Sequence, residues 1–326
     1  MIISKTPYRI SLVGGGTDLP EFFENHEDGG AVISFPINKY IYICINNLFE
    51  GNGYFLKYSN IERINSIDEI EHKIIRAVFN KYGVKKVDFS SIGDIPSGTG
   101  MGSSSAFTVG LLNSVREYIG KNEKSQSELA KEACEIEVDF LKAPIGFQDQ
   151  YGSALGGIKK ISFNKKRDIK VENIRLKPSS IEKLNQNTVL FYIGNKRSAS
   201  TILKKQAEDT INKERTRKSL VEMKKLADQL SNEIITDVDS VGNYLHQNWL
   251  LKRALTKGIT SETIDEIYKI GRENGATGGK LLGAGAGGSM LFYCPIAKQK
   301  SLIKSLSKLK HIHFQIDELG TSIVKI

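Results

Sequence analysis

The chain has 326 residues, of which 40% are hydrophobic and 25% are charged, and no apolar run approaches the length that a bilayer span requires. This composition is typical of a globular protein with a real core, and the length favours two ordinary domains over one large one. The net charge is +9, but its Lys and Arg residues are mixed with Glu and Asp at helical spacing across 204–225, which indicates solvated helix faces. Attraction of small anionic substrates remains a second explanation, whereas no nucleic-acid-binding motif is present.

The first half of the chain alternates predicted strands and helices. Runs of β-branched and aromatic residues indicate the strands, and apolar residues at helical spacing indicate the helices. Ser125 and Glu128 have the spacing of a capping box at the start of one helix. The predicted strands are Tyr8–Val13, Lys39–Asn46 and Val87–Ile92, and the predicted helices are Asp68–Tyr82, Ser103–Ile119 and Ser125–Leu141.

After Gly156 and Gly157 the sequence becomes basic and loop-like, so we place a boundary between domains 1–165 and 166–326. Strands and helices mix without strict βαβ alternation, which favours an α+β fold over a doubly wound sheet. One further helix and a terminal strand close the chain. Before them, helices are predicted at 200–230, 237–256 and 261–273, and a strand at 290–293.

A glycine- and serine-rich loop between a predicted strand and a predicted helix is the most informative stretch. Its three glycines alternate with other residues, so main-chain N–H groups can approach a bulky anion. Its serines lie at the positive end of the helix dipole. The loop lacks the lysine of the GxxxxGK[ST] motif, and an apolar helix follows it, which disfavours a flexible linker. The predicted phosphate-binding residues are Pro96, Ser97, Gly98, Thr99, Gly100, Met101, Gly102, Ser103, Ser104 and Ser105.

Two more glycine-rich loops are present. The stretch 275–288 contains a formal GxGxxG, but it leads into a strand instead of opening a helix, so we reject a dinucleotide-binding interpretation. The stretch 13–18, Val-Gly-Gly-Gly-Thr-Asp, ends the first predicted strand.

These three loops, in this order, resemble the motifs of the GHMP kinase superfamily over essentially the whole chain. Residues 96–106 resemble its PxxxGxGSSxA ATP loop, residues 275–288 its C-terminal glycine-rich motif, and residues 6–18 its N-terminal motif. The resemblance implies a two-domain fold in which the N-terminal domain is similar to the second domain of ribosomal protein S5. The C-terminal domain would be α/β-plait-like, the active site would lie between the halves, and ATP and Mg²⁺ would be the cofactors.

Within the superfamily, the chain departs from the Gly-Glu-His-Thr-Asp of galactokinases, because it carries Gly15-Gly-Thr-Asp18. That form, together with residues 137–152 and 194–203, resembles the branch that includes heptose 7-phosphate kinases and fucokinases. The resemblance implies phosphorylation of the anomeric hydroxyl of a sugar phosphate, most closely the heptose 7-phosphate step that supplies nucleotide-activated heptose. A fucokinase-like or other sugar-1-kinase stays an alternative, as does a non-catalytic binding protein of the same fold.

The resemblance also assigns the chemistry. Ser104 and Glu137 would hold Mg²⁺, which prefers hard oxygen ligands. Asp149 would accept or orient the proton of the attacking hydroxyl, with an N-cap role as the plain alternative. Arg9 would lie near the transferring phosphate, with a surface ion pair as its plain alternative. Glu137 has an exposed helix acid as its alternative, since three other acids crowd the same helix.

The remaining expectations concern the substrate and the setting of the protein. Thr17 and Asp18 would bind sugar hydroxyls, and Arg197 would bind the distal phosphate of the substrate, because a guanidinium matches phosphate oxygens. Further substrate residues are Gly15, Gly16, Gln148 and Gly285. The partners are ATP and a small sugar phosphate, with no nucleic acid and no membrane, and the oligomeric state stays open with a homodimer as one option. Without a leader-like N-terminus and with three cysteines in apolar surroundings, we expect a cytoplasmic protein.

Overall fold

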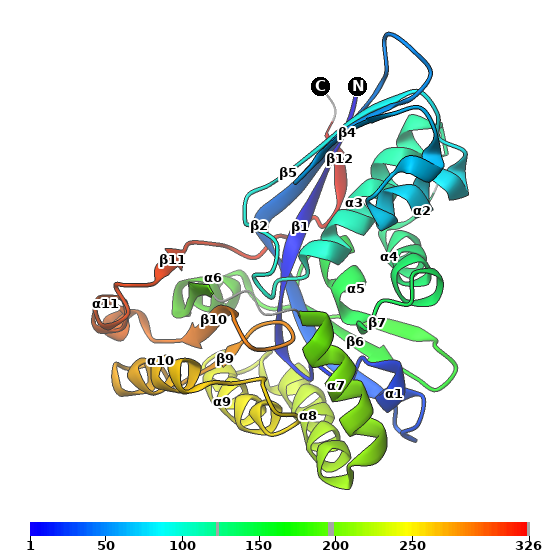
Figure 1. Cartoon of the computed structure of the whole chain (residues 1–326). Coiled ribbons are helices and arrows are strands. Elements are labelled where there is room, and N and C mark those ends of the chain that lie inside the picture. Colours follow the sequence, from blue (N-terminus) through cyan, green and yellow to red (C-terminus); the bar gives the residue numbers. More distant parts are fainter. Residues whose placement is uncertain (122–123, 195–198, 325–326) are drawn as a thin grey trace.

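Two sheets with helices packed against them make up the protein, a computed structural model of which describes residues 1–121, 124–194 and 199–324. Figure 1 shows the larger sheet and its helices in the upper and right-hand parts of the view and the smaller sheet with the later helices below and to the left. In the described part of the chain, no helix combines the length and apolarity that crossing a membrane would need. This two-domain mixture of helices and sheets confirms the expected α+β fold.

The larger sheet has the strand order β12-β1-β2-β5-β3-β4, and β6 pairs with β2 and β7. The long β2 spans both ends of this sheet, because its first half pairs with β6 and its second half with β5. Every pair is antiparallel except β3 with β5. The strands are β1 (Ile2–Val13), β2 (Gly30–Asn47), β3 (Tyr54–Lys57), β4 (Ile61–Ile64), β5 (Val87–Gly93), β6 (Lys159–Phe163), β7 (Ile169–Asn173) and β12 (Ser322–Val324).

Helices α3 and α5 pack against β1 and β2, and α2 and α4 pack against α3. The buried side of α3 is lined by apolar residues such as Val109, Leu112 and Val115. The helical elements of this half are α1 (Pro20–Phe23), η1 (Ile67–Glu69), α2 (Lys73–Tyr82), α3 (Ser103–Tyr118), α4 (Gln126–Cys134), η2 (Glu135–Phe140) and α5 (Gln148–Ala154).

The smaller sheet is antiparallel, with the order β11-β8-β10-β9. Helix α9 packs on β9 and β10 and buries Trp249 completely, and α8 packs between α9 and the strands β1 and β2 of the larger sheet. The elements are α6 (Pro178–Asn187), β8 (Thr188–Gly194), α7 (Ala199–Asn212), α8 (Glu214–Glu233), α9 (Ser240–Arg253), α10 (Glu262–Glu273), β9 (Gly278–Leu281), β10 (Gly288–Tyr293), α11 (Ile296–Ser305) and β11 (Lys310–Ile312).

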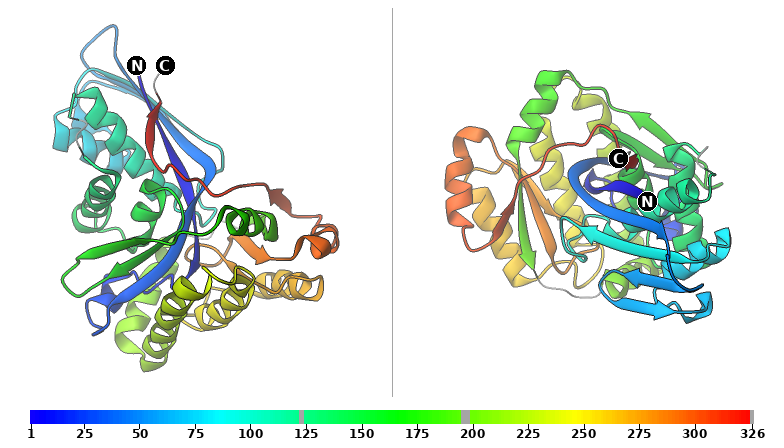
Figure 2. Two further views of the ribbon diagram at one scale, coloured as in Figure 1. Left: turned by 180° about the vertical axis from the view of Figure 1, so that it is seen from behind. Right: turned by 90° about the horizontal axis from the view of Figure 1, so that it is seen from above.

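The chain crosses between the two sheets more than once. After β11 it returns to the larger sheet, where β12 pairs antiparallel with the first residues of β1, as the view from behind in Figure 2 also shows. Both β12 and β7 therefore belong to the larger sheet although they follow residue 165. The boundary expected at 165/166 does not coincide with this division of the strands.

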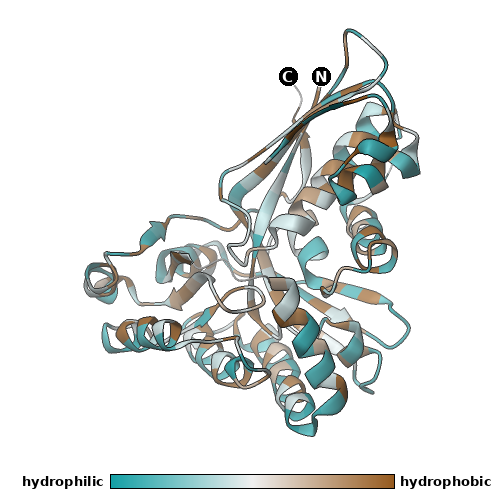
Figure 3. Cartoon of the chain, viewed as in Figure 1, coloured by the Kyte–Doolittle hydropathy of each residue, from teal (hydrophilic) through white to brown (hydrophobic). Residues whose placement is uncertain are grey.

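The hydropathy of the helices fits this arrangement. In Figure 3 the helices show hydrophilic and hydrophobic residues interleaved along their turns, as helices with one buried face must. In α10, for example, Ile264, Ile267 and Tyr268 are buried whereas Glu262 and Glu266 are exposed. The buried apolar residues of the smaller sheet and its helices are continuous with those of the larger sheet in one hydrophobic cluster.

Several elements differ from the sequence-based expectation. The helix expected from Asp68 begins only at Lys73, because Ser66 caps the short η1 turn and Ile70 then adopts an extended conformation. The helix expected at 125–141 does begin with the Ser125 capping box, but it widens at Glu135 into a π-helical turn.

The helix expected at 200–230 is two helices. Lys213 is extended, and the Arg217 guanidinium binds the carbonyl groups of Thr210 and Ile211 that end α7. Residues 278–281, expected within a glycine-rich loop, form the strand β9. Gly279 lies where an added Cβ would be 2.5 Å from the ring of Phe292 in β10, so this strand needs glycine to pack.

Candidate active site

The loop at residues 96–102 has a backbone that only glycine adopts without strain. Gly98, Gly100 and Gly102 have φ values of +79°, +80° and +72°, and Gly102 is the N-cap of α3. Pro96, Ser97 and Gly98 are exposed, whereas the side chains of Thr99 and Met101 are buried and pack the loop against the protein. The loop thus presents main-chain N–H groups at the start of a long helix, which is a good setting for an anion.

The second glycine-rich loop packs directly on the first. A Cβ added to Gly100 would be 2.6 Å from the carbonyl oxygen of Leu282, and one added to Gly283 would be 2.5 Å from the Cα of Gly100. Gly288 is similarly close to the carbonyl oxygen of Thr99. The two loops, far apart in the sequence, therefore meet backbone to backbone.

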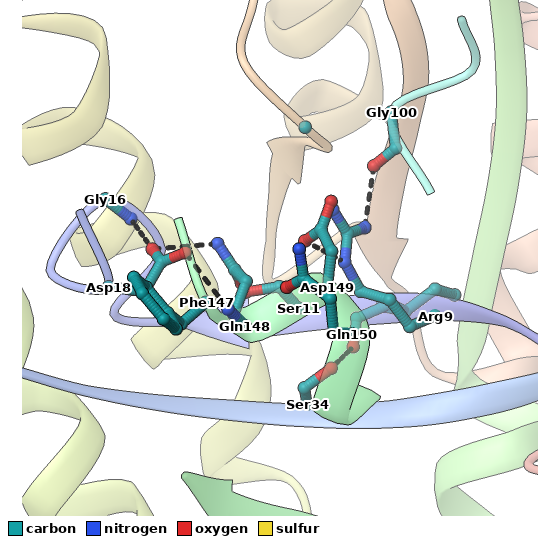
Figure 4. Close-up of polar contacts among 12 residues, drawn as sticks. Arg9, Ser11, Gly16, Asp18, Ser34, Gly100, Phe147, Gln148, Asp149 and Gln150 are labelled. Atoms are coloured by element: carbon teal, nitrogen blue, oxygen red, sulfur yellow. Dashed lines mark hydrogen bonds and ion pairs between the residues drawn. The ribbon is translucent and has the colours of Figure 1, made fainter. Parts of the chain in front are cut away.

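Arg9 of β1 joins this loop to an acid on α5. Its Nε donates to Oδ1 of Asp149 at 2.8 Å, its Nη2 lies 2.7 Å from the same oxygen, and its Nη1 donates to the carbonyl oxygen of Gly100 at 2.8 Å. Figure 4 shows these contacts in one view. Because Arg9 is only 3% exposed, the surface ion pair considered for it is wrong, and its guanidinium is a buried part of the site.

Asp149 is the second residue of α5, and the N-cap of this helix is Phe147, so an N-cap role for Asp149 is excluded. Its carboxylate is partly exposed and faces a cavity between the two halves of the chain. We call this space the central cavity. It is lined by Arg9, Ser11, Gly15, Gly16, Asp18, Leu19, Ile145, Gly146, Gln148, Asp149, Leu203, Gln206, Lys252, Lys280, Gly283 and Ala284.

The predicted metal ligands also lie together. Ser104 Oγ donates to Oε1 of Glu137 at 2.9 Å, and Nε2 of Gln150 donates to Oε2 of Glu137 at 2.8 Å. The π-helical turn carries Glu137 to this position, where it is 1% exposed, so it is not an ordinary surface acid. Burial raises the pKa of its carboxyl, and hydrogen bonds from Ser105, Ser104 and Gln150 oppose that rise.

Asp18 and Gln148 tie the third glycine-rich loop to α5. Oδ1 of Asp18 accepts hydrogen bonds from Gly16 N at 2.8 Å and from Gln148 Nε2 at 3.0 Å, and Oδ2 accepts one from Gln148 N at 3.3 Å. Burial raises the pKa of Asp18, and the nearby Asp149 carboxylate adds to the rise. The side chains of Asp18 and Gln148 line the central cavity, together with Gly15 and Gly16.

Two predicted substrate residues, Thr17 and Gly285, are placed differently from the expectation. Thr17 is fully buried, and its hydroxyl bonds to the backbone of Gly14 and Ala31, so it holds the turn and does not line the cavity. Gly285 packs on Ile259, and its neighbours Gly283 and Ala284 line the cavity in its place. Arg197 lies outside the described residues.

Sequence reasoning missed several residues of the central cavity. Lys252 and Lys280 line it while being 5% and 1% exposed, and Ser11, at 4% exposed, has a hydroxyl with no hydrogen-bond partner. Gln206 of α7 closes the cavity near Gly16. The only available signal was that Lys280 directly follows Gly278-Gly279 within the second glycine-rich stretch, where the pattern indicates a loop.

A second cavity lies on the other side of the phosphate-binding loop. It has a volume of about 450 Å³, and Pro96, Ser97, Ser103 and Ser104 form part of its wall. The rest of the wall is largely apolar or aromatic and includes Tyr8, Ile41, Tyr58, His72, Ile74, Ile92, Ile95 and Phe107. This combination suits a flat, mostly apolar group attached to an anion.

Comparisons with known proteins agree with this geometry. Residues 69–157 match the family model described as the GHMP kinases N terminal domain, and residues 223–310 match the one described as GHMP kinases C terminal. Together the two matches span more than half of the chain.

Individual relatives cover nearly the full length. A D-glycero-alpha-D-manno-heptose 7-phosphate kinase of Campylobacter jejuni is 28% identical over 322 aligned positions, covering 94% of this chain and 93% of the relative. A galactokinase of Thermotoga petrophila is 26% identical over 349 aligned positions, covering 96% and 95%. The crystal structure of a D-glycero-D-manno-heptose 1-phosphate kinase from Bacteroides thetaiotaomicron matches with a TM-score of 0.80 and 22% identity, covering 100% of this chain and 99% of that one.

Proposed function

The chain belongs to the GHMP kinase family, and from this premise we propose that it transfers the γ-phosphoryl group of ATP to the anomeric hydroxyl of a sugar phosphate. The proposed substrate is D-glycero-D-manno-heptose 7-phosphate and the product its 1,7-bisphosphate, a step toward nucleotide-activated heptose in the cytoplasm. The relatives support a sugar kinase of this family, and the heptose 7-phosphate kinase among them supports this choice of substrate.

One observation carries the proposal: Arg9 bridges the carboxylate of Asp149 and the Gly100 carbonyl of the phosphate-binding loop. A group that can accept a proton is thereby held beside a loop that can hold a phosphate, at the edge of a cavity lined by polar groups. Phosphoryl transfer needs this combination of positioning and charge stabilisation.

The nucleotide would lie across the phosphate-binding loop. Its phosphates would accept hydrogen bonds from main-chain N–H groups of residues 97–105, and its adenosine would occupy the second cavity beside Tyr58, His72 and Phe107. The terminal phosphate would then point toward Gly100, Arg9 and the central cavity.

Ser104, Glu137 and Gln150 fit the requirements of a Mg²⁺ site. They supply oxygen atoms, Glu137 is buried and already oriented by two hydrogen bonds, and Mg²⁺ usually takes few protein ligands because it keeps waters and phosphate oxygens. When bound, the ion would neutralise charge on the β- and γ-phosphates. Glu137 and Ser104 would hold it, and Gln150 would orient Glu137.

Asp149 would act on the acceptor. Its Oδ1 is held by Arg9, and no described residue donates to its Oδ2, which is free to accept the proton of the sugar hydroxyl. The anomeric oxygen forms a bond to the γ-phosphorus, the bond from that phosphorus to the β–γ bridging oxygen breaks, ADP leaves, and the hydroxyl proton passes to Asp149. Arg9 keeps the carboxylate in place.

The sugar would be recognised at the far end of the central cavity. Asp18 and Gln148 present a carboxylate and an amide oxygen toward it, and the Gly15 and Gly16 backbone allows close approach. Arg197 stays our candidate for the distal phosphate of the sugar.

A sugar panel tests the proposal. Purified protein would be incubated with ATP, Mg²⁺ and one of heptose 7-phosphate, L-fucose, galactose or mannose, with ADP release and ³¹P NMR of the product as readouts. We expect turnover of heptose 7-phosphate and a new phosphate signal on C1. Turnover of L-fucose alone would move the assignment to the fucokinase-like alternative, and no transfer to any sugar would favour a non-catalytic binding protein.

A further inference from the structure

Two lysines of the second half of the chain reach into the central cavity. Lys252 comes from the last turn of α9 and Lys280 from β9, and they are 5% and 1% exposed. Lysine is almost never buried to this degree unless it is paired. Lys252 belongs to no motif assigned above, and Lys280 lies in the C-terminal glycine-rich motif without a role assigned to it, so their burial beside the reacting groups needs its own explanation.

Both ammonium groups contact only backbone oxygens. Lys280 Nζ donates to the carbonyl oxygens of Ser11 at 2.8 Å and Leu12 at 3.0 Å, and Lys252 Nζ donates to those of Leu281 at 3.2 Å and Gly283. An ammonium group has three N–H donors, so one donor on each lysine is left for another acceptor. No carboxylate among the described residues forms an ion pair with either lysine.

A buried cation without a counterion is unfavourable, and the ionisation of these lysines reflects this. Burial lowers the pKa of Lys252 to about 8, the nearby Arg9 contributes to this lowering, and Asp18 and Asp149 work in the opposite direction. Burial likewise lowers the pKa of Lys280 well below its ordinary value. A bound anion would restore the balance of charge in the cavity.

The contacts of Lys252 indicate where that anion lies. Lys252 binds the carbonyl oxygen of Gly283, and Gly283 packs on Gly100 of the phosphate-binding loop. Arg9 binds the carbonyl oxygen of Gly100. Arg9 and Lys252 therefore both attach to the place where the two glycine loops meet, which is the end of the phosphate-binding loop that faces the central cavity.

Building on the proposed kinase reaction, we propose that Lys252 and Lys280 form a second cationic wall of the active site that binds the γ-phosphoryl group during its transfer. Their free N–H groups donate to its non-bridging oxygens, and no covalent bond to either lysine forms. Arg9 and the two lysines then share the negative charge that the phosphoryl group carries between ADP and the acceptor oxygen. The distal phosphate of the sugar is not their ligand.

Nucleotide binding tests this directly, because ADP lacks the group in question. Dissociation constants would be measured with Mg²⁺ for ADP, for the non-hydrolysable imido analogue of ATP, and for ADP with aluminium fluoride. For Lys252→Met we expect ADP binding within about twofold of the wild type, the imido analogue weakened about tenfold, and the fluoride complex weakened about a hundredfold, since the loss grows toward the transition state. Lys252→Arg should recover most of the loss because it keeps the cation.

Lys269→Met is the matched control, since Lys269 is an exposed lysine of α10 whose contact with Glu273 is a surface ion pair. It should behave like the wild type with all three ligands. A uniform loss of all three ligands in Lys252→Met, not restored by Lys252→Arg, would mean that Lys252 only supports the Gly283 loop and would overturn the inference. If Lys252→Met fails to melt cooperatively, Lys280→Met measured in the same way decides.

Two further outcomes separate this inference from the proposed function. A rise in KM for the sugar phosphate, with all three nucleotide constants unchanged, would assign the lysines to the distal phosphate and overturn the inference while leaving the kinase assignment intact. If the wild type transfers phosphate to no sugar but the three ligands still show the graded loss, the inference stands and the proposed sugar substrate falls.

Discussion

Arg9 and Asp149, 140 residues apart in the chain, form an ion pair in which Nε and Nη2 of the buried guanidinium both contact Oδ1 of the partly exposed carboxylate. The third guanidinium nitrogen, Nη1, binds the Gly100 carbonyl oxygen. One side chain thereby fixes the distance between the acid on α5 and the phosphate-binding loop. A lysine in this position could not make both contacts with the same geometry.

Replacing Asp149 by Asn should lower kcat by about a hundredfold to ten-thousandfold, because the amide cannot accept the proton of the attacking hydroxyl. The amide oxygen of this variant can still accept the Arg9 hydrogen bond, so the loop should stay in place and the dissociation constant of ATP should change little. Steady-state kinetics and calorimetric ATP binding check this, with Asp88→Asn of β5, a partly exposed acid, as the control. Unchanged turnover would remove the proton-accepting role.

The role of Ser11 in sugar binding can be tested by comparing Ser11→Ala with Ser34→Ala. Its buried hydroxyl lines the central cavity without a partner, so Ser11→Ala should cost no stability but raise KM for the sugar about tenfold, the value of one hydrogen bond. Ser34→Ala removes a hydroxyl that donates to Ile10 O at 2.9 Å, so it should lower the free energy of unfolding by about 1 kcal/mol and leave KM alone. The opposite pattern for the two variants would show that Ser11 is only a packing residue.

Alanine variants of Gly98 and Gly100 distinguish the cost of backbone strain in the phosphate-binding loop from the cost of disturbing its contact with the second glycine-rich loop. Both have positive φ, but an added Cβ meets nothing at Gly98 and lies 2.6 Å from Leu282 O at Gly100. Gly98→Ala should therefore lower the free energy of unfolding only by the backbone term of about 1–2 kcal/mol. Gly100→Ala should lower it by clearly more and should also weaken ATP binding, because the two glycine loops must move apart. Equal melting temperatures for the two variants would argue against the close packing of the loops.

Lys252 should make the reaction sensitive to alkaline pH. Its charge is needed for the phosphoryl group and its pKa in the folded protein is about 8, so kcat/KM for ATP should fall as the pH rises through about 8. The charged groups that face it are Arg9, Asp18, Asp149 and Lys280, and burial lowers the pKa of Lys280 as well. In Lys252→Arg the fall should move to higher pH, because a guanidinium stays charged.

The lowered pKa of Lys252 should also make the stability of the protein depend on pH. The pKa in the folded state lies below the ordinary value of 10.5, so the unfolded chain binds more protons between about pH 8 and pH 10.5. The free energy of unfolding of the wild type should therefore rise with pH across this window, relative to that of Lys252→Met. Below the window, the difference in the free energy of unfolding between the two proteins should stay constant. Urea unfolding at about pH 7, 9 and 10 measures this, and parallel curves throughout would contradict the burial of the charge.

Local sequence patterns predicted the elements whose residues decide their own structure. The glycine spacing at 98, 100 and 102, the Ser125 capping box and the apolar face of α3 are all present as expected. The strand–loop–helix order around the phosphate-binding loop could also be predicted, because each part has its own signature. Comparison by resemblance then brought Ser104, Glu137, Asp149 and Arg9 into one site, and in the structure Ser104 contacts Glu137 and Arg9 contacts Asp149.

The features of the site that the sequence did not predict depend on contacts between segments far apart in the chain. Nothing local distinguishes Lys252 from the many surface lysines, and it lines the cavity only because α9 packs on β9. Thr17 was expected to reach the sugar, but the turn it belongs to needed a hydroxyl to satisfy backbone groups of Gly14 and Ala31. Which of two neighbouring polar residues faces a cavity is decided by tertiary packing, which periodicity does not report.

The position of β12 has a consequence for how the protein is made. Because Ser322–Val324 pair with Ile3, Ser4 and Lys5, the outer edge of β1 stays uncovered on the ribosome until residues 322–324 have emerged. Nascent chains would expose an unpaired strand edge throughout that time, which invites chaperone binding or aggregation. A fragment that stops at residue 165 would carry the same open edge permanently.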